Sequence, residues 1–271
     1  MSNERVQKVL ANAGYGSRRE IEKWIVAGRI MVNGVKVVLG DRLGDKDVVK
    51  IDGRIIKFGH NAELRNTIRV IALNKAEGTI STRQDPDNRP TVFDTLPRLK
   101  QQRWVTVGRL DINTSGLLLL TTDGELANRL MHPSFEIERE YLVRVMGEVT
   151  PDMIRELTRG VELDGSHMKF GTVELYHNQV ASRITNSGVG LYSSGKANQW
   201  YKVTLAEGKN REVRRLWEHC GLRVSRLIRT RYGPIILGKK LKAGEVRELD
   251  KDEISLLHKL TAEAKPRQAA D

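Results

Sequence analysis

The sequence contains a single cysteine, no long apolar run and fewer acidic than basic residues. The lone Cys220 excludes an internal disulfide and a cysteine-rich zinc site, as is usual in a reducing cytoplasm. No stretch approaches the roughly 18 apolar residues of a membrane span, and the N-terminal MSNERVQKVLANAG lacks the apolar region of a secretory signal. We therefore expect a soluble, cytoplasmic protein with no membrane partner.

The deficit of acidic residues indicates a polyanionic partner. The chain carries 46 Lys and Arg against 34 Asp and Glu, a formal net charge of +12, and nucleic acid is the first candidate for such a partner. With 271 residues, 39% of them apolar, the chain is long enough for two domains with their own cores. His219 beside Cys220 raises the possibility of a metal site, but two neighbours alone favour a packed helix, so we expect no metal.

Residues 1–60 have the pattern of a small α+β module. Apolar residues at helical spacing predict a short helix over 6–13, and a Ser-Arg-Arg-Glu capping box opens a second helix over 17–28. Asn33-Gly34 and Asp52-Gly53, each flanked by β-branched residues, predict two tight hairpins. So thin a core suits a binding module better than an enzyme.

Basic residues gather around the second of these helices and the first hairpin. On charge alone, a solvated helix face and a nucleic-acid surface explain them equally well. The stretch VQKVLANAGYGSRREIEKWIVAGRIMVNGVKV resembles the S4 RNA-binding domain. This resemblance implies that four residues face RNA phosphates: Arg18, Arg19, Lys23 and Arg29. HNAELRNT is polar and has no periodicity, so we interpret 61–67 as a linker.

From residue 68 the pattern changes to strands and turns that alternate with helices. LLLLTT, which lies between two glycine-containing turns, predicts a buried strand, and ELANRLM predicts the helix after it. EYLVRVMGEV, KFGTVELYH and WYKVTLAEG predict further strands, and DMIRELTRG predicts a helix. We expect an α+β domain on a mainly antiparallel mixed sheet over 68–253, followed by a polar tail at 254–271, of which we expect TAEAKPRQAAD, residues 261–271, to be disordered.

GLYSSGKA, residues 190–197, comes one residue short of a phosphate-binding P-loop. Ala197 stands where a Ser or Thr hydroxyl would bind Mg²⁺, and no apolar strand leads into the stretch. We interpret it as a flexible loop, which disfavours a nucleotide hydrolase.

A second basic cluster spans 208–233, GKNREVRRLWEHCGLRVSRLIRTRYG. It contains eight Lys and Arg but only two acidic residues, so we expect an anion to bind within the cluster. Arg211, Arg214 and Arg215 cannot share one face of a helix, so at least one of them points inward toward a site. The last three arginines suggest a strip along an RNA path: Arg226, Arg229 and Arg231. The RNA contacts expected in the whole cluster are Lys209, Arg211, Arg215, Arg226 and Arg229.

Three motifs, in order, resemble the RsuA-type ribosomal RNA pseudouridine synthases: GRLDINTSGLLLLTTDGELANRLMHPS, EREYLVRV and EGKNREVRRLWE. With the S4-like segment, the resemblance covers nearly the whole chain. Asn74-Lys75-Ala76-Glu77-Gly78 lacks the proline of the family's usual NKPxG pattern, and Asn210-Arg211-Glu212 replaces an aromatic residue, His and Gln, which favours the large-subunit branch. The resemblance implies isomerisation of one uridine in a stem-loop of large-subunit (23S) ribosomal RNA.

The implied reaction breaks the bond from ribose C1′ to uracil N1, turns the base and joins C1′ to C5, so it requires neither metal nor organic cofactor. By resemblance, Asp111 is the carboxylate that attacks C1′ or takes the 2′ proton to give a glycal, and both routes stay open. Because a carboxylate beside a leucine strand would lose hydration, we expect Arg214, at the family's motif position, to pair with it and keep it charged. Tyr141 is implied to stack on the uracil, and Arg109 to fill the gap left by the flipped nucleotide.

Each assignment has a structural alternative when the residues are taken singly. Asp111 could be a turn or cap residue, Tyr141 a half-buried strand residue and Arg214 a surface residue of a helix. The competing function is a noncatalytic RNA-binding or ribosome-assembly factor, which would need the basic residues but not Asp111. We expect a monomer that acts on ribosomal RNA, either naked or within an assembly intermediate.

Overall fold

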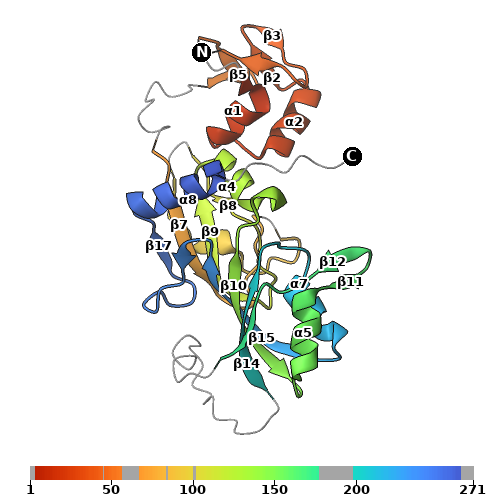
Figure 1. The fold of residues 1–271 in the computed structure, drawn as a ribbon. Coiled ribbons are helices and arrows are strands. Elements are labelled where there is room, and N and C mark those ends of the chain that lie inside the picture. Colours follow the sequence, from red (N-terminus) through yellow and green to blue (C-terminus); the bar gives the residue numbers. More distant parts are fainter. Residues whose placement is uncertain are drawn as a thin grey trace. The chain divides into compact units, whose positions relative to one another are not determined.

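The computed structural model describes residues 4–44, 46–56, 67–83, 85–99, 102–176 and 198–263 (Figure 1). The chain divides into two compact units. The first comprises Met1–Arg69, Pro97–Val105 and Thr121–Gly124, and the second comprises Val70–Leu96, Thr106–Leu120 and Glu125–Asp271. The stretch predicted as a loop at 190–197, and all of the predicted linker at 61–67 except Thr67, lie outside the described residues.

Two helices and two small antiparallel sheets form the N-terminal unit. The helices are α1 (Val6–Asn12) and α2 (Arg18–Val26), and the predicted capping box of Ser17 and Glu20 is present. One sheet has the order β3-β2-β5-β6 and contains both predicted hairpins, while β1 pairs with β4. The strands are β1 (Glu4–Arg5), β2 (Ile30–Val32), β3 (Val35–Lys36), β4 (Arg42–Leu43), β5 (Val49–Ile51) and β6 (Arg54–Ile56).

The core of this unit is small and aliphatic. Helical periodicity turns one apolar face of each helix toward the sheet, so the side chains at these positions are fully buried. The most deeply buried are Val6, Leu10, Ile21, Ile30 and Val49.

A nine-stranded mixed sheet is the framework of the second unit. Its main path runs β13-β14-β10-β15-β9-β7-β17, with β16 beside β15 and β8 beside β9. β10 is antiparallel to both of its neighbours, whereas β9 and β15 are parallel, which confirms the predicted mixed, mainly antiparallel sheet. The strands are β7 (Val70–Lys75), β8 (Val105–Thr106), β9 (Ser115–Thr121), β10 (Arg139–Met146), β13 (Val173–Leu175), β14 (Gln199–Leu205), β15 (Arg223–Tyr232), β16 (Ile235–Ile236) and β17 (Val246–Glu248).

The helices α5 (Pro151–Arg159) and α7 (Glu212–His219) lie beside β10, β14 and β15 (Figure 1). Trp217 of α7 is fully buried, and its ring packs against the ring of Tyr201 at 5.4 Å between centroids. Since strand side chains alternate between faces, Tyr141 and Val143 of β10 join this core, whereas Glu140 and Leu142 point to the opposite face of the sheet. The remaining elements are α4 (Gly124–Met131), the hairpin of β11 (Val161–Leu163) and β12 (Ser166–Met168), and two 3₁₀ turns, η1 (Val92–Thr95) and η2 (Pro133–Phe135).

The first ten residues of the predicted polar tail, 254–263, are helical. They belong to a final helix, α8 (Lys251–Glu263), in which Leu257 is fully buried and Thr261 is 4% exposed. These two residues and Ile254 lie three and four apart, so all three share one helix face. Among the described helices, none is long and apolar enough to cross a membrane.

Candidate active site

Asp111 lies in the loop between β8 and β9. The loop is closed by a turn in which the Thr114 amide donates to the Asp111 carbonyl over 3.0 Å. It then enters β9 at Gly116, whose φ is +100° and where a β-carbon would lie 2.3 Å from the Arg229 carbonyl oxygen. Only glycine permits this close approach of β9 to β15. The start of β9 therefore fixes where the Asp111 loop ends.

The carboxylate of Asp111 is exposed, which contradicts the predicted desolvation. The buried leucines begin at Leu117, six residues later, and the side chains at 111–113 stay at the surface. Within the described parts of the chain, no hydrogen bond or ion pair within 4.0 Å engages this carboxylate. Asp111 is therefore open to a ligand and does not need a cation to offset burial.

The backbone of the loop is held by a segment that begins at the end of β7. Ser81 accepts from the Leu110 amide over 3.3 Å and donates to its carbonyl over 3.0 Å. The Gly78 amide donates to the Ile112 carbonyl over 2.9 Å. The loop thus presents an exposed acid on a backbone that is fixed on both sides of it.

Lys75 is a buried residue beside the Asp111 loop to which sequence reasoning gave no role. Its side chain is fully buried, and its ammonium group donates to the carbonyls of Thr114 (2.8 Å), Ala76 (3.0 Å) and Ile112 (3.4 Å). Burial lowers the pKa of Lys75 to about 8, against the opposing attraction of Glu77 and Asp111. A lysine that ends the otherwise apolar strand VIALNK was the available signal, but the motif drew attention to its missing proline instead.

Arg214 points inward from α7, as predicted for at least one arginine of this helix. It is 8% exposed, and its two terminal nitrogens donate to the carbonyls of Val224 (3.0 Å) and Asn113 (2.8 Å). Burial lowers its pKa, while Asp111 is among the charges that raise it. The predicted ion pair with Asp111 is not formed; instead Arg214 binds the backbone of the same loop two residues later, and its Nε is buried without a partner in the described structure.

Strand register brings Tyr141 into the same region. Tyr141 on β10 lies opposite Arg229 on β15, and Arg229 is paired in turn with Gly116 on β9. Tyr141 is 7% exposed and packs in the core that contains Trp217. Arg229 is 3% exposed, and its Nε donates to the Leu117 carbonyl over 2.7 Å. The stacking role of Tyr141 stays a prediction.

The predicted RNA contacts of the N-terminal unit fall into two classes. Arg18, Arg19 and Lys23 are exposed on α2. Arg29 forms a two-pronged ion pair with Asp52, at 2.8 and 2.5 Å, which raises the pKa of Arg29 and lowers that of Asp52. Arg29 is therefore already committed to a partner in its own unit, unlike the other three.

In the second basic cluster, five carboxylates, four of them from outside the segment, pair with much of the charge, and the expectation that an anion fills the cluster stays a prediction. The ion pairs are Lys209–Glu207, Arg211–Glu218, Arg215–Asp164, Arg226–Glu77 and Arg231–Glu138. All ten of these side chains are at least partly exposed to solvent, where such pairs contribute about 0–1 kcal/mol and can exchange for phosphate.

The predicted strip along β15 is wrong. Arg226 and Arg229 lie three residues apart on a regular part of the strand, so they point to opposite faces of the sheet. Arg226 is partly exposed, whereas Arg229 is buried against Tyr232, 5.2 Å from the ring centroid. Arg109, two residues before Asp111, is exposed at the loop itself.

The described residues contain no group of three or more His, Cys, Asp or Glu side chains that could hold a metal ion. His219 lies 2.9 Å from the Glu156 carboxylate. Burial and the nearby Glu156 raise the pKa of the Cys220 thiol, which favours its protonated form.

Comparison with known proteins agrees with this arrangement. Residues 69–219 match the model of the RNA pseudouridylate synthase family, and residues 4–49 match that of the S4 domain. The chain is 51% identical over 254 residues to ribosomal large subunit pseudouridine synthase B of Pseudomonas aeruginosa, covering 94% of this chain and 61% of that protein. It is 52% identical over 262 residues to the protein of the same name in Salmonella typhimurium, covering 95% and 83% of the two chains.

One solved structure, a pseudouridylate synthase, superposes with a TM-score of 0.61 at 24% identity, covering 94% of this chain and 99% of the other. This likeness supports the fold.

Proposed function

The chain belongs to the RNA pseudouridylate synthase family, and on that premise we propose that it converts one uridine of large-subunit ribosomal RNA to pseudouridine, with Asp111 as the catalytic carboxylate. The RNA class comes from the names of the relatives. The observation that carries the role of Asp111 is its loop: an exposed acid on a backbone held by Lys75, Gly78, Ser81 and Arg214.

A fixed loop matters because the carboxylate must act at one atom of a flipped nucleotide. Asp111 either attacks C1′ of the ribose, so that the bond to N1 breaks, or removes the 2′ proton to give a glycal. In both routes the freed uracil turns and its C5 joins C1′, and the C5 proton is released. Preorganisation of the acid removes the cost of ordering it during the reaction.

The other predicted residues have places consistent with these steps. Arg109 is exposed beside Asp111, where it can occupy the gap left by the extruded nucleotide. Tyr141 lies two strands from the start of β9, on the same face of the sheet as Arg229. Arg18, Arg19 and Lys23 add an exposed basic surface to the N-terminal unit for phosphates of the same RNA. The monomeric state and the cytoplasmic location expected from the sequence stay predictions.

Ribosomal RNA labelled with tritium at uridine C5 tests the proposal directly, because formation of the C1′–C5 bond must release the label. We expect release from large-subunit RNA and none from small-subunit RNA at equal concentration. RNA binding without release from any form of the large-subunit RNA, naked or in assembly intermediates, would favour a noncatalytic assembly factor.

A further inference from the structure

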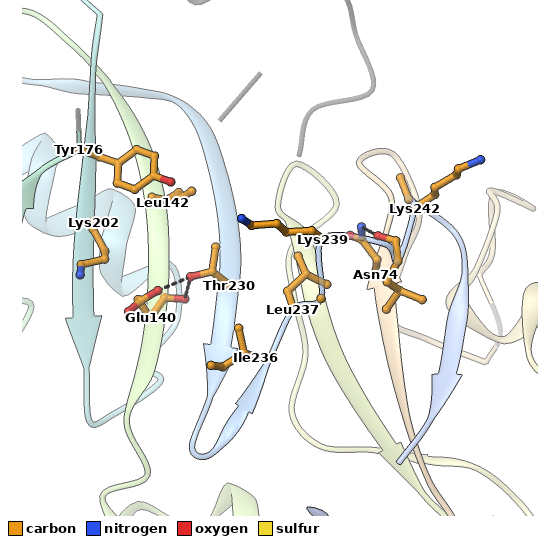
Figure 2. A pocket seen from close by; sticks show the side chains of 13 residues that line it. Asn74, Glu140, Leu142, Tyr176, Lys202, Thr230, Ile236, Leu237, Lys239 and Lys242 are labelled. Atoms are coloured by element: carbon orange, nitrogen blue, oxygen red, sulfur yellow. Dashed lines mark hydrogen bonds between the residues drawn. The ribbon is translucent and has the colours of Figure 1, made fainter. Parts of the chain in front are cut away.

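A cavity of about 190 Å³ lies on the face of the sheet opposite to Tyr141 (Figure 2). One wall consists of side chains from β10, β14 and β15, and the other of the segment 236–243 between β16 and β17. Every lining residue belongs to the second unit. None of the lining residues belongs to the Asp111 loop, and the steps above do not use the cavity.

The segment that forms the outer wall is tied to the sheet at both ends. The Leu237 amide donates to the Thr230 carbonyl over 2.7 Å. Asn74 on β7 donates from its side chain to the Leu241 carbonyl over 2.8 Å, and its own carbonyl accepts from the Gly244 amide over 2.7 Å. The cavity is thus framed by hydrogen bonds to two strands and is not a gap beneath a loose loop.

The charges around the cavity are unequal. Glu140 accepts from the Thr230 hydroxyl over 2.8 Å and lies 3.8 Å from Arg231, while Lys202 lies 2.9 Å from Glu174. Each acidic side chain near the wall formed by β10, β14 and β15 therefore has a cationic side chain within 4.0 Å. Lys239 and Lys242 on the outer wall are exposed, and no carboxylate of the described residues lies within 4.0 Å of either ammonium group.

The wall opposite these lysines includes an apolar and an aromatic side chain, Leu142 and Tyr176. Leu142 is 3% exposed and packs with Tyr176, and Figure 2 shows Lys239 extending from the outer wall across to β15, near these two side chains. Such a surface accepts the flat face of an unpaired base, as aromatic side chains do in single-stranded RNA recognition. The volume is below the roughly 300–1,000 Å³ of sites for drug-sized ligands, which limits the occupant to about one base.

We propose that this cavity binds one unpaired nucleotide of RNA, with the base against Tyr176 and Leu142 and the adjoining phosphates at Lys239 and Lys242. The proposal rests on the proposed function, because the RNA substrate supplies the nucleotide. Because Tyr141 and Leu142 point to opposite faces of the sheet, the bound nucleotide is not the target uridine. The protein then holds two separate segments of its RNA.

A pentanucleotide of uridine with a central 4-thiouridine tests the site by photo-cross-linking to the full-length protein. We expect cross-links in the peptides that contain Tyr176 or residues 236–243. Tyr176→Phe, which keeps the ring, should retain them. Tyr176→Leu should lower the affinity at this site roughly fivefold or more, as loss of one base stack does.

The matched charge variants are Lys239→Gln/Lys242→Gln and Lys251→Gln/Lys259→Gln, both of which remove two exposed lysines, the second pair from α8 and outside the cavity lining. Two lost phosphate contacts should flatten the plot of log affinity against log salt by about 1.4 for the first pair alone. A fourfold rise in salt would then cost the wild type about sevenfold more affinity than it costs this variant.

Tritium release from a target stem-loop, measured at saturation, should be equal in the α8 control pair and in the wild type. Absence of release in the wild type would refute the proposed function, while the cross-links would still report on the cavity. Cross-links only at the Asp111 loop, or equal salt slopes for the two lysine pairs, would overturn the nucleotide site and leave the lysines to a protein partner.

Discussion

The two units use their cations differently. The second unit buries three of them against backbone carbonyls or strands near the Asp111 loop: Lys75, Arg214 and Arg229. The N-terminal unit leaves three exposed on α2: Arg18, Arg19 and Lys23. A buried cation is costly unless its donors are bonded, so the first group must shape the protein itself, whereas the second group is available for phosphates.

This difference predicts that substitutions of buried and of exposed cations have different consequences. Loss of a buried cation leaves carbonyls of the loop unpaired, so turnover and stability fall together. Loss of an exposed cation changes neither but weakens RNA affinity in a salt-dependent manner. Asp111, the carboxylate beside the buried cations, is exposed, and none of the described residues forms a hydrogen bond or an ion pair with its carboxylate.

Asp111→Asn should therefore have the largest effect on turnover and the smallest on the fold. The amide keeps the shape of the side chain and removes the charge that both routes require. We expect no detectable tritium release, with melting temperature and RNA affinity as in the wild type. Appreciable turnover by a pure preparation would assign the chemistry to another group.

Arg214→Ala should be damaging in both respects. It leaves the carbonyls of Asn113 and Val224 without a donor, at about 1–3 kcal/mol for each acceptor that stays buried, and it frees the loop after Asp111. Both the melting temperature and kcat should fall. Arg215→Ala is the control, since this neighbour is partly exposed and pairs with Asp164, and it should lose less than about 1 kcal/mol. Equal stability in the two variants would contradict the role of Arg214 in the loop.

Sequence patterns predicted the elements with local signals. Ser17 and Glu20 specify their own capping box, and Asn33-Gly34 specifies its own turn, because each depends on residues a few positions apart. The final helix also has local signals, because Ile254, Leu257 and Thr261 stand at helical spacing and Asp250 and Glu253 form a reciprocal cap, so the prediction of a tail overlooked a pattern that the sequence contains.

The candidate site was predictable in its members but not in its contacts. The motifs place Asp111, Tyr141 and Arg214 in one site by resemblance, and strand register and hydrogen bonds bring their segments together. The backbone partners of Arg214 lie 10 and 101 positions away in sequence, and the loop carbonyls that Lys75 binds lie 37 and 39 positions away. No local pattern contains such contacts.

Lys75→Met tests the buried group by its effect on pH dependence. The pKa of Lys75 is about 8 in the folded protein and 10.5 as its ordinary value, so the ammonium loses a proton as pH rises through about 8. One of the donors that hold Thr114, Ala76 and Ile112 is then lost, and we expect kcat to fall over this range. Lys75→Arg, which stays charged, should remove the decrease, and Lys75→Met should be slow at every pH. A wild-type profile that stays flat to pH 9 would contradict this account.

The lowered pKa of Lys75 affects stability in the direction opposite to its effect on kcat. Between about pH 8 and 10.5 the unfolded chain binds a proton at this lysine that the folded chain has released, so the contribution of Lys75 to the free energy of unfolding increases with pH. At 1.36 kcal/mol per pKa unit the increase is at most about 3 kcal/mol. The difference between wild type and Lys75→Met in urea titrations should therefore grow from pH 8 to pH 10.

Substitution of the three exposed cations on α2 should have the smallest effect. In full-length protein, Arg18→Gln/Arg19→Gln/Lys23→Gln should leave the melting temperature and saturated turnover unchanged, because these side chains are exposed on α2 and have no ion pair within 4.0 Å among the described residues. Three lost phosphate contacts should flatten the plot of log RNA affinity against log salt by about 2 for single-stranded segments, and more where the RNA is helical.

Arg29→Gln should instead lower stability slightly, since Arg29 already binds Asp52, and should alter the slope less than any one of the other three. An unchanged slope in the triple variant would mean that α2 binds something other than RNA phosphates, and the division between shaping and binding cations would then hold only for the second unit.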